Sequence, residues 1–166
     1  MKKILSATII ISILILSMAG CKRTASNNDD FIKIAREEIP VADADTIDIQ
    51  IIGSVDKDNR SLVCYMTGNE TQDHSYFALE FKNKGKARYE FIKLYKMMKR
   101  GTDIYVLSWR DGSVFIVNND ACKYIQLANP EGEPQLIEIG ILPFLHYSEP
   151  IPTEYNFLDS DENILN

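Results

Sequence analysis

The sequence predicts an α+β fold in which an N-terminal helix packs on an antiparallel β-meander sheet. Two observations support this. A segment near residue 30 has helical periodicity, and after Pro40 the chain continues as short apolar runs separated by turn residues. Consecutive short strands joined by tight turns favour a meander. The 146 residues that follow residue 20 are enough for one domain with one core.

The predicted helix covers Asp30–Glu38. Asn28, Asp29 and Asp30 offer side chains that can cap its N-terminus, and Pro40 cannot continue it. Phe31, Ile34 and Ala35 recur at helical spacing, which is typical of a helix that lies on a core.

Alternating apolar and polar residues predict most of the strands. In TIDIQII the isoleucines at 47, 49 and 51 share one face, and Asp111-Gly112 between two apolar runs is a strong hairpin signal. The predicted strands cover 46–52, 61–67, 75–82, 103–109, 113–117, 123–127 and 135–141.

The segment 87–98 fits two patterns. Phe91, Leu94, Tyr95 and Met98 have helical spacing, but aromatic residues in the same segment also alternate. We favour a long strand, because glycine turns lie on both sides. From Pro143 onward we expect an irregular tail that wraps the domain through four aromatic residues, Phe144, Tyr147, Tyr155 and Phe157.

Residues 1–20 have the organisation of a secretory signal. Lys2 and Lys3 form a basic head, and residues 4–20 carry no charge. A helix that spans a membrane needs about 20 apolar residues. The run is at the short limit, so an uncleaved span flanked by Lys22 and Arg23 is the alternative.

Met18-Ala19-Gly20-Cys21 resembles the lipobox of bacterial prolipoproteins, with Met18 at a position where leucine is usual. The resemblance implies cleavage after Gly20 and a diacylglycerol on Cys21. It therefore predicts a signal peptide over 1–20, a lipidated cysteine and flexible tether over 21–28, and a single domain over 29–166. The location that it implies is the extracytoplasmic face of the cell membrane.

Charge is unevenly distributed. The chain has a net charge of −6, which becomes −8 without Lys2 and Lys3, and an acidic chain argues against nucleic-acid binding. One segment is strongly basic, with Glu90 as its single acid, and we interpret it as a candidate surface for anionic lipid or wall polymer. A solvated strand face is the alternative. Its residues are Lys82, Lys84, Lys86, Arg88, Lys93, Lys96, Lys99 and Arg100.

Motifs for metals and cofactors are absent from the sequence. Asp43, Asp45 and Asp48 lack the glycine and distal glutamate of a calcium loop, and two histidines without CxxC pairs do not form a zinc site. We expect neither a metal nor a cofactor. Whether Cys64 and Cys122 form a disulfide remains open at this stage.

Catalytic signals are weak. Asp73, His74 and Ser75 are adjacent, but a triad depends on spatial placement rather than on neighbours in sequence. His146 lies in an apolar stretch where we expect it to pack, and Trp109 belongs to an aromatic stripe that we assign to the core.

The expectation is therefore a membrane-anchored envelope lipoprotein whose domain is a non-enzymatic binding or interaction module, with a protein partner as one option. One alternative is a small solute-binding lipoprotein. The other is a small hydrolase that uses His74.

Overall fold

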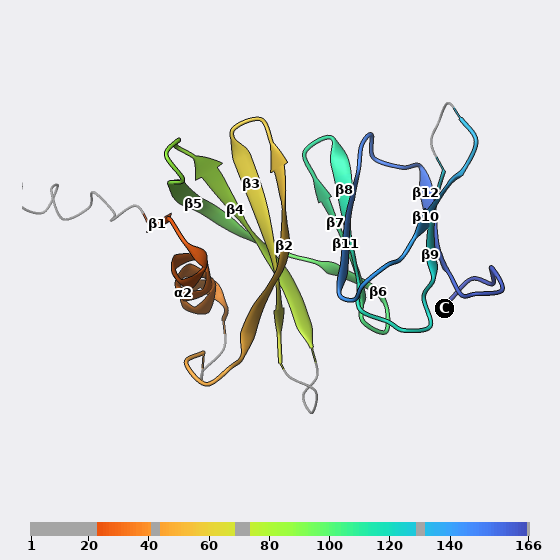
Figure 1. The fold of residues 1–166 in the computed structure, drawn as a ribbon, viewed down its shortest axis with the longest axis horizontal. Helices are drawn as coiled ribbons and strands as arrows, with labels where there is room; N and C mark the ends of the chain where they lie inside the picture. The colour runs from red at the N-terminus through yellow and green to blue at the C-terminus, as the bar shows by residue number, and fades with distance from the viewer. Residues whose placement is uncertain (1–22, 41–43, 69–73, 129–131, 166) are drawn as a thin grey trace, which may run out of the picture.

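The protein is a mostly β structure with three antiparallel sheets (Figure 1). The computed structural model describes residues 23–40, 44–68, 74–128 and 132–165. Strands make up 55% of the structure and helix 8%. The predicted α+β class is therefore wrong. Within the described residues the single helix is α2, Asn28–Glu38.

Sheet A has five strands in the order β1-β5-β4-β3-β2, sheet B has four in the order β11-β8-β7-β6, and sheet C has three in the order β10-β9-β12. The strands of sheet A are β1 (Thr24–Ala25), β2 (Ile49–Lys57), β3 (Arg60–Thr67), β4 (Ser75–Asn83) and β5 (Tyr89–Lys96). Those of sheet B are β6 (Met98–Gly101), β7 (Ile104–Trp109), β8 (Gly112–Val117) and β11 (Phe144–Ser148). Those of sheet C are β9 (Tyr124–Ala128), β10 (Gln135–Glu138) and β12 (Glu154–Leu158).

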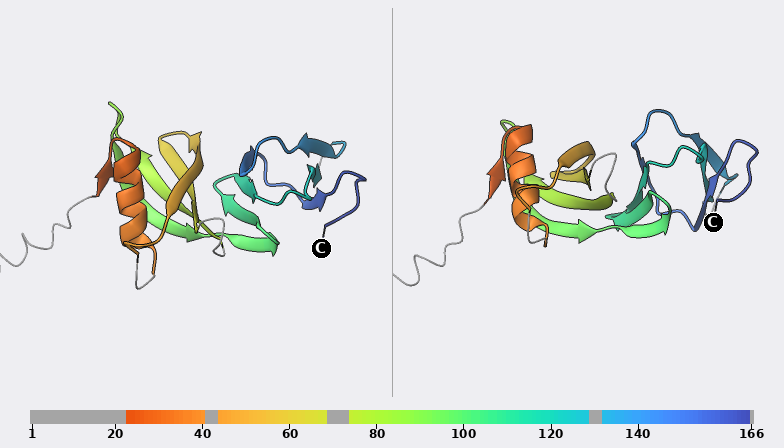
Figure 2. Two further views of the ribbon diagram at one scale, coloured as in Figure 1. Left: turned by 60° about the horizontal axis from the view of Figure 1, so that its bottom comes forward. Right: turned by 90° about the horizontal axis from the view of Figure 1, so that it is seen from below.

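The helix and the sheets are stacked in layers (Figure 2). A separate cluster of apolar residues lies at each boundary between layers. Ile34 and Ala35 of α2 contact one face of sheet A, whose buried residues there include Val63. The opposite face of sheet A meets sheet B, and the second face of sheet B meets sheet C. This stacking is the reason for the error in fold class, because most of the sheet surface is covered by other sheets and not by a helix.

Two strands show the stacking in their sequence. The side chains of β3 from Ser61 to Met66 are all buried, as are those of β8 from Gly112 to Val117. In SLVCYM and SVFIV, charged residues do not interrupt the sequence, because both faces of each strand are covered by another layer of the structure. A short continuous apolar run between turns is the expected pattern for such a strand.

The helix was predicted well. It begins at Asn28, two residues before the predicted start, and ends at Glu38 as expected. Asn27 is the N-cap, and its side-chain oxygen accepts a hydrogen bond of 2.9 Å from the backbone N–H of Asp30.

The prediction of strand for 87–98 is confirmed, but the strand changes sheet. Tyr89–Lys96 pairs with β4 in sheet A, and Met98–Gly101 pairs with β7 in sheet B. Met97 lies between the two strands. This segment is therefore a direct covalent link between sheets A and B.

The C-terminal segment is not an irregular tail. Phe144–Ser148 forms β11 at the edge of sheet B, and Glu154–Leu158 forms β12 in sheet C. The three prolines that suggested irregular structure precede these strands and do not interrupt them. The strand predicted over 135–141 is shorter than expected and ends at Glu138.

The chain becomes ordered earlier than the predicted tether of 21–28 allows. Thr24 and Ala25 form β1 and pair with Glu90 and Tyr89 of β5. The backbone N–H of Phe91 donates to the carbonyl of Arg23 at 2.9 Å. Residues 21 and 22 of the predicted tether, Cys21 included, lie outside the described residues. The described N-terminal end and the C-terminus lie at opposite ends of the molecule (Figure 1).

Candidate functional site

A cavity of about 640 Å³ opens at the end of sheet A, where β4 begins and β5 ends. Pockets that hold small ligands have volumes of roughly 300–1,000 Å³ and are mostly apolar. The residues that line the cavity come from the chain just after α2 and from five strands or their flanks. They are Ile39, Pro40, Ile47, Thr67, Gly68, Ser75, Tyr76, Phe77, Leu94, Lys96, Met97 and Tyr105.

The apolar part of the lining is set by strand register. Phe77 is opposite Lys96 in the β4–β5 pair. Leu94 lies two residues before Lys96 in β5 and on the same face of the strand. The Phe77 ring stacks on Tyr65 with ring centroids 5.1 Å apart. Ile39, the residue after α2, packs against the same cluster. The ends of the helix and of the strands therefore converge to form an apolar wall.

A second wall consists of aromatic side chains held by hydrogen bonds. The rings of Tyr76 and Tyr105 lie 4.3 Å apart. The Tyr76 hydroxyl donates to Asp103 at 3.3 Å and accepts from the Asn118 amide at 3.0 Å. Burial, and then the charge of Asp103, raise the pKa of Tyr76. Tyr76 therefore stays neutral at physiological pH and fixes this wall.

The opening carries the polar groups. Thr67 and Ser75 are opposite each other in the β3–β4 pair, and the Thr67 hydroxyl donates to the Ser75 carbonyl at 3.4 Å. Lys96 is exposed and is the single charged residue among the described residues that line the cavity. Within the part of the chain that the structure describes, Lys96 has no ion-pair partner. A mostly apolar cavity with a lone cation at its opening suits binding better than covalent chemistry.

His74 was the candidate for hydrolysis. Its Nδ1 lies 3.9 Å from Asp103 Oδ1, longer than a hydrogen bond, and its ring meets Tyr76 edge to face. Asp73 lies outside the described residues, and the residues that line the cavity do not include His74. Among the described residues, therefore, His74 has no acid at hydrogen-bonding distance that would orient it as a general base.

The eight basic residues predicted as one surface are divided among several places. Lys84, Lys86 and Arg88 lie in the β4–β5 turn, and Lys82 precedes them on β4. Lys93 lies over the Tyr95 ring at 4.2 Å. The other three lie further along the chain. Lys96 is at the cavity, and Lys99 and Arg100 are on β6 of sheet B, with Arg100 5.5 Å from the Tyr155 ring.

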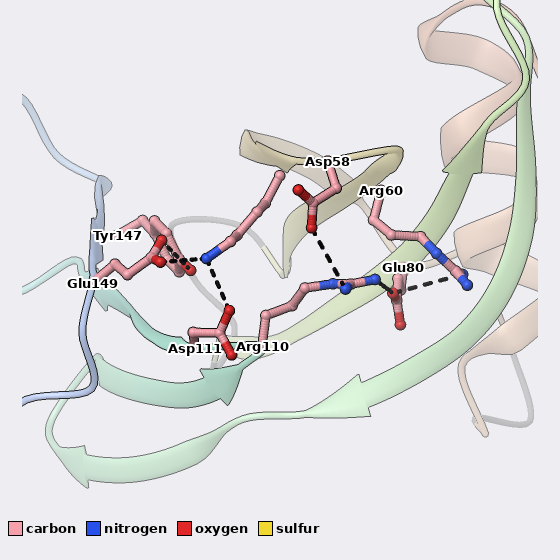
Figure 3. A network of polar contacts seen from close by, with 8 residues as sticks. Asp58, Arg60, Glu80, Arg110, Asp111, Tyr147 and Glu149 are labelled. Carbon is pink, nitrogen blue, oxygen red and sulfur yellow. Dashed lines mark hydrogen bonds and ion pairs between the residues drawn. The ribbon is translucent and has the colours of Figure 1, made fainter.

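A buried charged network lies on the face of sheet A that meets sheet B (Figure 3). Glu80 has a side chain only 8% exposed, and its carboxylate lies 3.7 Å from Arg60 and 3.6 Å from Arg110. The Tyr95 hydroxyl donates to Glu80 at 2.9 Å. Arg110 belongs to the β7–β8 turn, so Glu80 links the two sheets. Glu80 lies on the face of β4 opposite to Leu79 and Phe81, and this face meets sheet B.

A second ion cluster reinforces the same junction. Lys57, at the end of β2, donates to Asp111 at 3.1 Å and to Glu149. Hydrogen bonds to these carboxylates, above all Glu149, raise the pKa of Lys57. Three segments that are distant in sequence therefore meet at the edge between sheets A and B.

The other residues considered in the sequence analysis pack within the protein and do not line the cavity. Cys64 and Cys122 are free and buried in different clusters, which answers the disulfide question, and burial raises the pKa of Cys64 to about 12. Trp109 is 2% exposed, as a core assignment requires. His146 stacks on Phe144, and burial lowers its pKa.

The described residues contain no group of three or more His, Cys, Asp or Glu side chains placed to hold a metal. Asp43 lies outside these residues. No described helix is long and apolar enough to cross a membrane, and the apolar run 4–20 is not part of the described chain. No protein-family model, curated protein or solved structure matches the chain.

The Glu80 network generates a stability prediction. Replacing Glu80 with Gln removes the charge that Arg60 and Arg110 share. Breaking a buried ion pair costs roughly 3–5 kcal/mol, and we expect about 2 kcal/mol here because both arginine side chains are partly exposed. Urea unfolding followed by the fluorescence of the single tryptophan, Trp109, measures the change.

The matched control is Asp58→Asn, which also removes an acid beside Arg110. Asp58 is 69% exposed and 3.9 Å from that arginine, so its loss should change stability by about 0.5 kcal/mol or less. Equal effects of Glu80→Gln and Asp58→Asn would contradict a buried role for Glu80.

Proposed function

We propose that the protein is a lipid-anchored component of the bacterial cell envelope whose folded part binds a small apolar molecule and performs no catalysis. The cavity at the end of sheet A carries the binding part of the proposal, since its volume and lining match those of ligand pockets. The lipobox-like motif that ends at Cys21 supports the anchor. This proposal develops the small solute-binding alternative that the sequence allowed.

The short distance in sequence between Cys21 and β1 indicates where the ligand would be encountered. Thr24 is three residues after Cys21, and an extended chain of that length spans about 10 Å. Acylation of Cys21 would hold sheet A close to the lipid surface. A ligand that partitions into or leaves the membrane would then be present at high local concentration.

The anchor is tested by Cys21→Ala in the bacterial host. Because the acylated thiol would be lost, we expect the precursor to remain unprocessed and to lose its radiolabelled palmitate. A matched control is Cys64→Ala, which removes a buried thiol outside the motif. Normal cleavage and labelling in the Cys21 variant would overturn the lipoprotein proposal.

The pocket is tested with a photoreactive dodecanol probe on the lipidated protein in nanodiscs. Ser75 is exposed at the opening, and we expect Ser75→Trp to fill the cavity with little change in the core. Labelling of peptides that contain Leu94 or Met97 should fall by about tenfold, which corresponds to about 1.4 kcal/mol of binding free energy. Mass spectrometry locates the label.

The matched control for this variant is Ser108→Trp. Ser108 is likewise exposed on a strand but does not line the cavity. Labelling should persist in this variant. If the wild-type cavity peptides take up no label, or if both variants label equally, the cavity is not a binding site.

The β4–β5 turn supports a second candidate function, contact with an anionic surface. Lys86 and Arg88 are exposed, and they have no ion-pair partner among the described residues. They immediately precede Tyr89, which pairs with Ala25 of β1. In an anchored protein this turn would therefore lie near the lipid head groups, where each basic residue contributes about 1 kcal/mol on an anionic leaflet.

This second function is tested with Lys86→Glu/Arg88→Glu in the lipidated protein. On vesicles rich in phosphatidylglycerol at low salt, we expect the double variant to lose the protection of the β4–β5 turn amides from hydrogen exchange and to leave exchange in the rest of the chain unchanged. The control is Lys99→Glu, since Lys99 lies on β6, away from β1. Identical protection on neutral vesicles would contradict an electrostatic contact.

A further inference from the structure

We propose that the cavity accepts a single-chain amphiphile with an anionic head group, in the class of a long-chain fatty acid, and that Lys96 selects the head group. This inference rests on the proposed binding function and adds the chemistry of the ligand. It is drawn from the lining of the cavity and from the position of its one cation.

The apolar lining defines the tail of the ligand. Ile39, Ile47, Phe77 and Leu94 present hydrocarbon surface on one side, and Met97 lies on the other. An unbranched chain can bury methylene groups against all of these residues. Each buried methylene contributes about 0.8 kcal/mol, so a chain gains affinity along its whole length.

The polar lining defines the head. Lys96 is an exposed residue of the cavity lining, and Thr67 and Ser75 are the lining residues that carry aliphatic hydroxyls. A carboxylate accepts hydrogen bonds from an ammonium and from a hydroxyl such as that of Ser75, and bonds to an ionised partner are about twice as strong as neutral ones. The ligand would thus lie with its tail in the cavity and its head at the rim.

The charge of the lining disfavours a cationic head group. Lys96 is the single charge among the described residues that line the cavity, and it would repel such a head. A neutral head would forgo the ionic contact but keep the tail contacts. The expected order of affinity is therefore carboxylate, then alcohol, then ammonium.

The test uses three photoreactive probes with the same dodecyl chain that end in a carboxylate, an alcohol or a trimethylammonium group. They are applied to the lipidated wild type and to Lys96→Glu in nanodiscs of neutral lipid, with Lys99→Glu as the control. Lys99 is also an exposed strand lysine, but it lies outside the cavity. Mass spectrometry quantifies the label on peptides that line the cavity.

We expect the wild type and Lys99→Glu to bind the carboxylate about tenfold more tightly than the alcohol, a difference of about 1.4 kcal/mol. In Lys96→Glu the carboxylate probe should no longer bind more tightly than the alcohol probe, and the ammonium probe should bind more tightly than it does to the wild type. Alcohol labelling that stays constant across the variants shows that the cavity is intact.

The outcomes separate the two proposals. If no probe labels the cavity of the wild type, both the binding function and its refinement are wrong. If all three probes label it equally, or if Lys96→Glu and Lys99→Glu behave alike toward the carboxylate, the pocket function stands and selection of an anionic head by Lys96 is overturned.

Discussion

The burial of the second face of sheet A against sheet B is the constraint on which the rest of the structure depends. The cluster between them contains Leu62 and Ala78 of sheet A, and Trp109 and Val114 of sheet B. Because α2 covers only one face of sheet A, β3 would otherwise expose a row of large apolar residues to water. Burial of such surface contributes about 25 cal/mol per Å². Sheet B in turn has a second apolar face, and sheet C covers it.

This contact determines where the polar groups and the cavity lie. Glu80 faces sheet B, so it must be neutralised within the interface, and Arg60 and Arg110 approach it from the two sheets. The chain passes from sheet A to sheet B at Met97. The cavity opens at that crossing, between residues that remain in sheet A and Tyr105 of sheet B. A ligand held there would contact both sheets.

The sequence was sufficient for local structure but not for the layers. Capping residues and Pro40 marked the helix to within two residues, and alternation located most strands. The interface role of Glu80 could not be predicted from its strand, because polar alternation looks the same whether the second face meets solvent or another sheet. The continuous run in SVFIV was the available signal for two covered faces. The cavity combines Ile39, Phe77 and Tyr105, whose proximity depends on pairings that no local pattern encodes.

Native-state hydrogen exchange measures most directly whether the contact between sheets A and B organises the molecule. If it does, the slowest amides of β3 and β8 should exchange through one opening with the same free energy, equal to that of global unfolding. They should also respond in parallel to denaturant. Exchange of β8 at a lower free energy, while β3 remains protected, would show that the sheets unfold independently and would contradict this account.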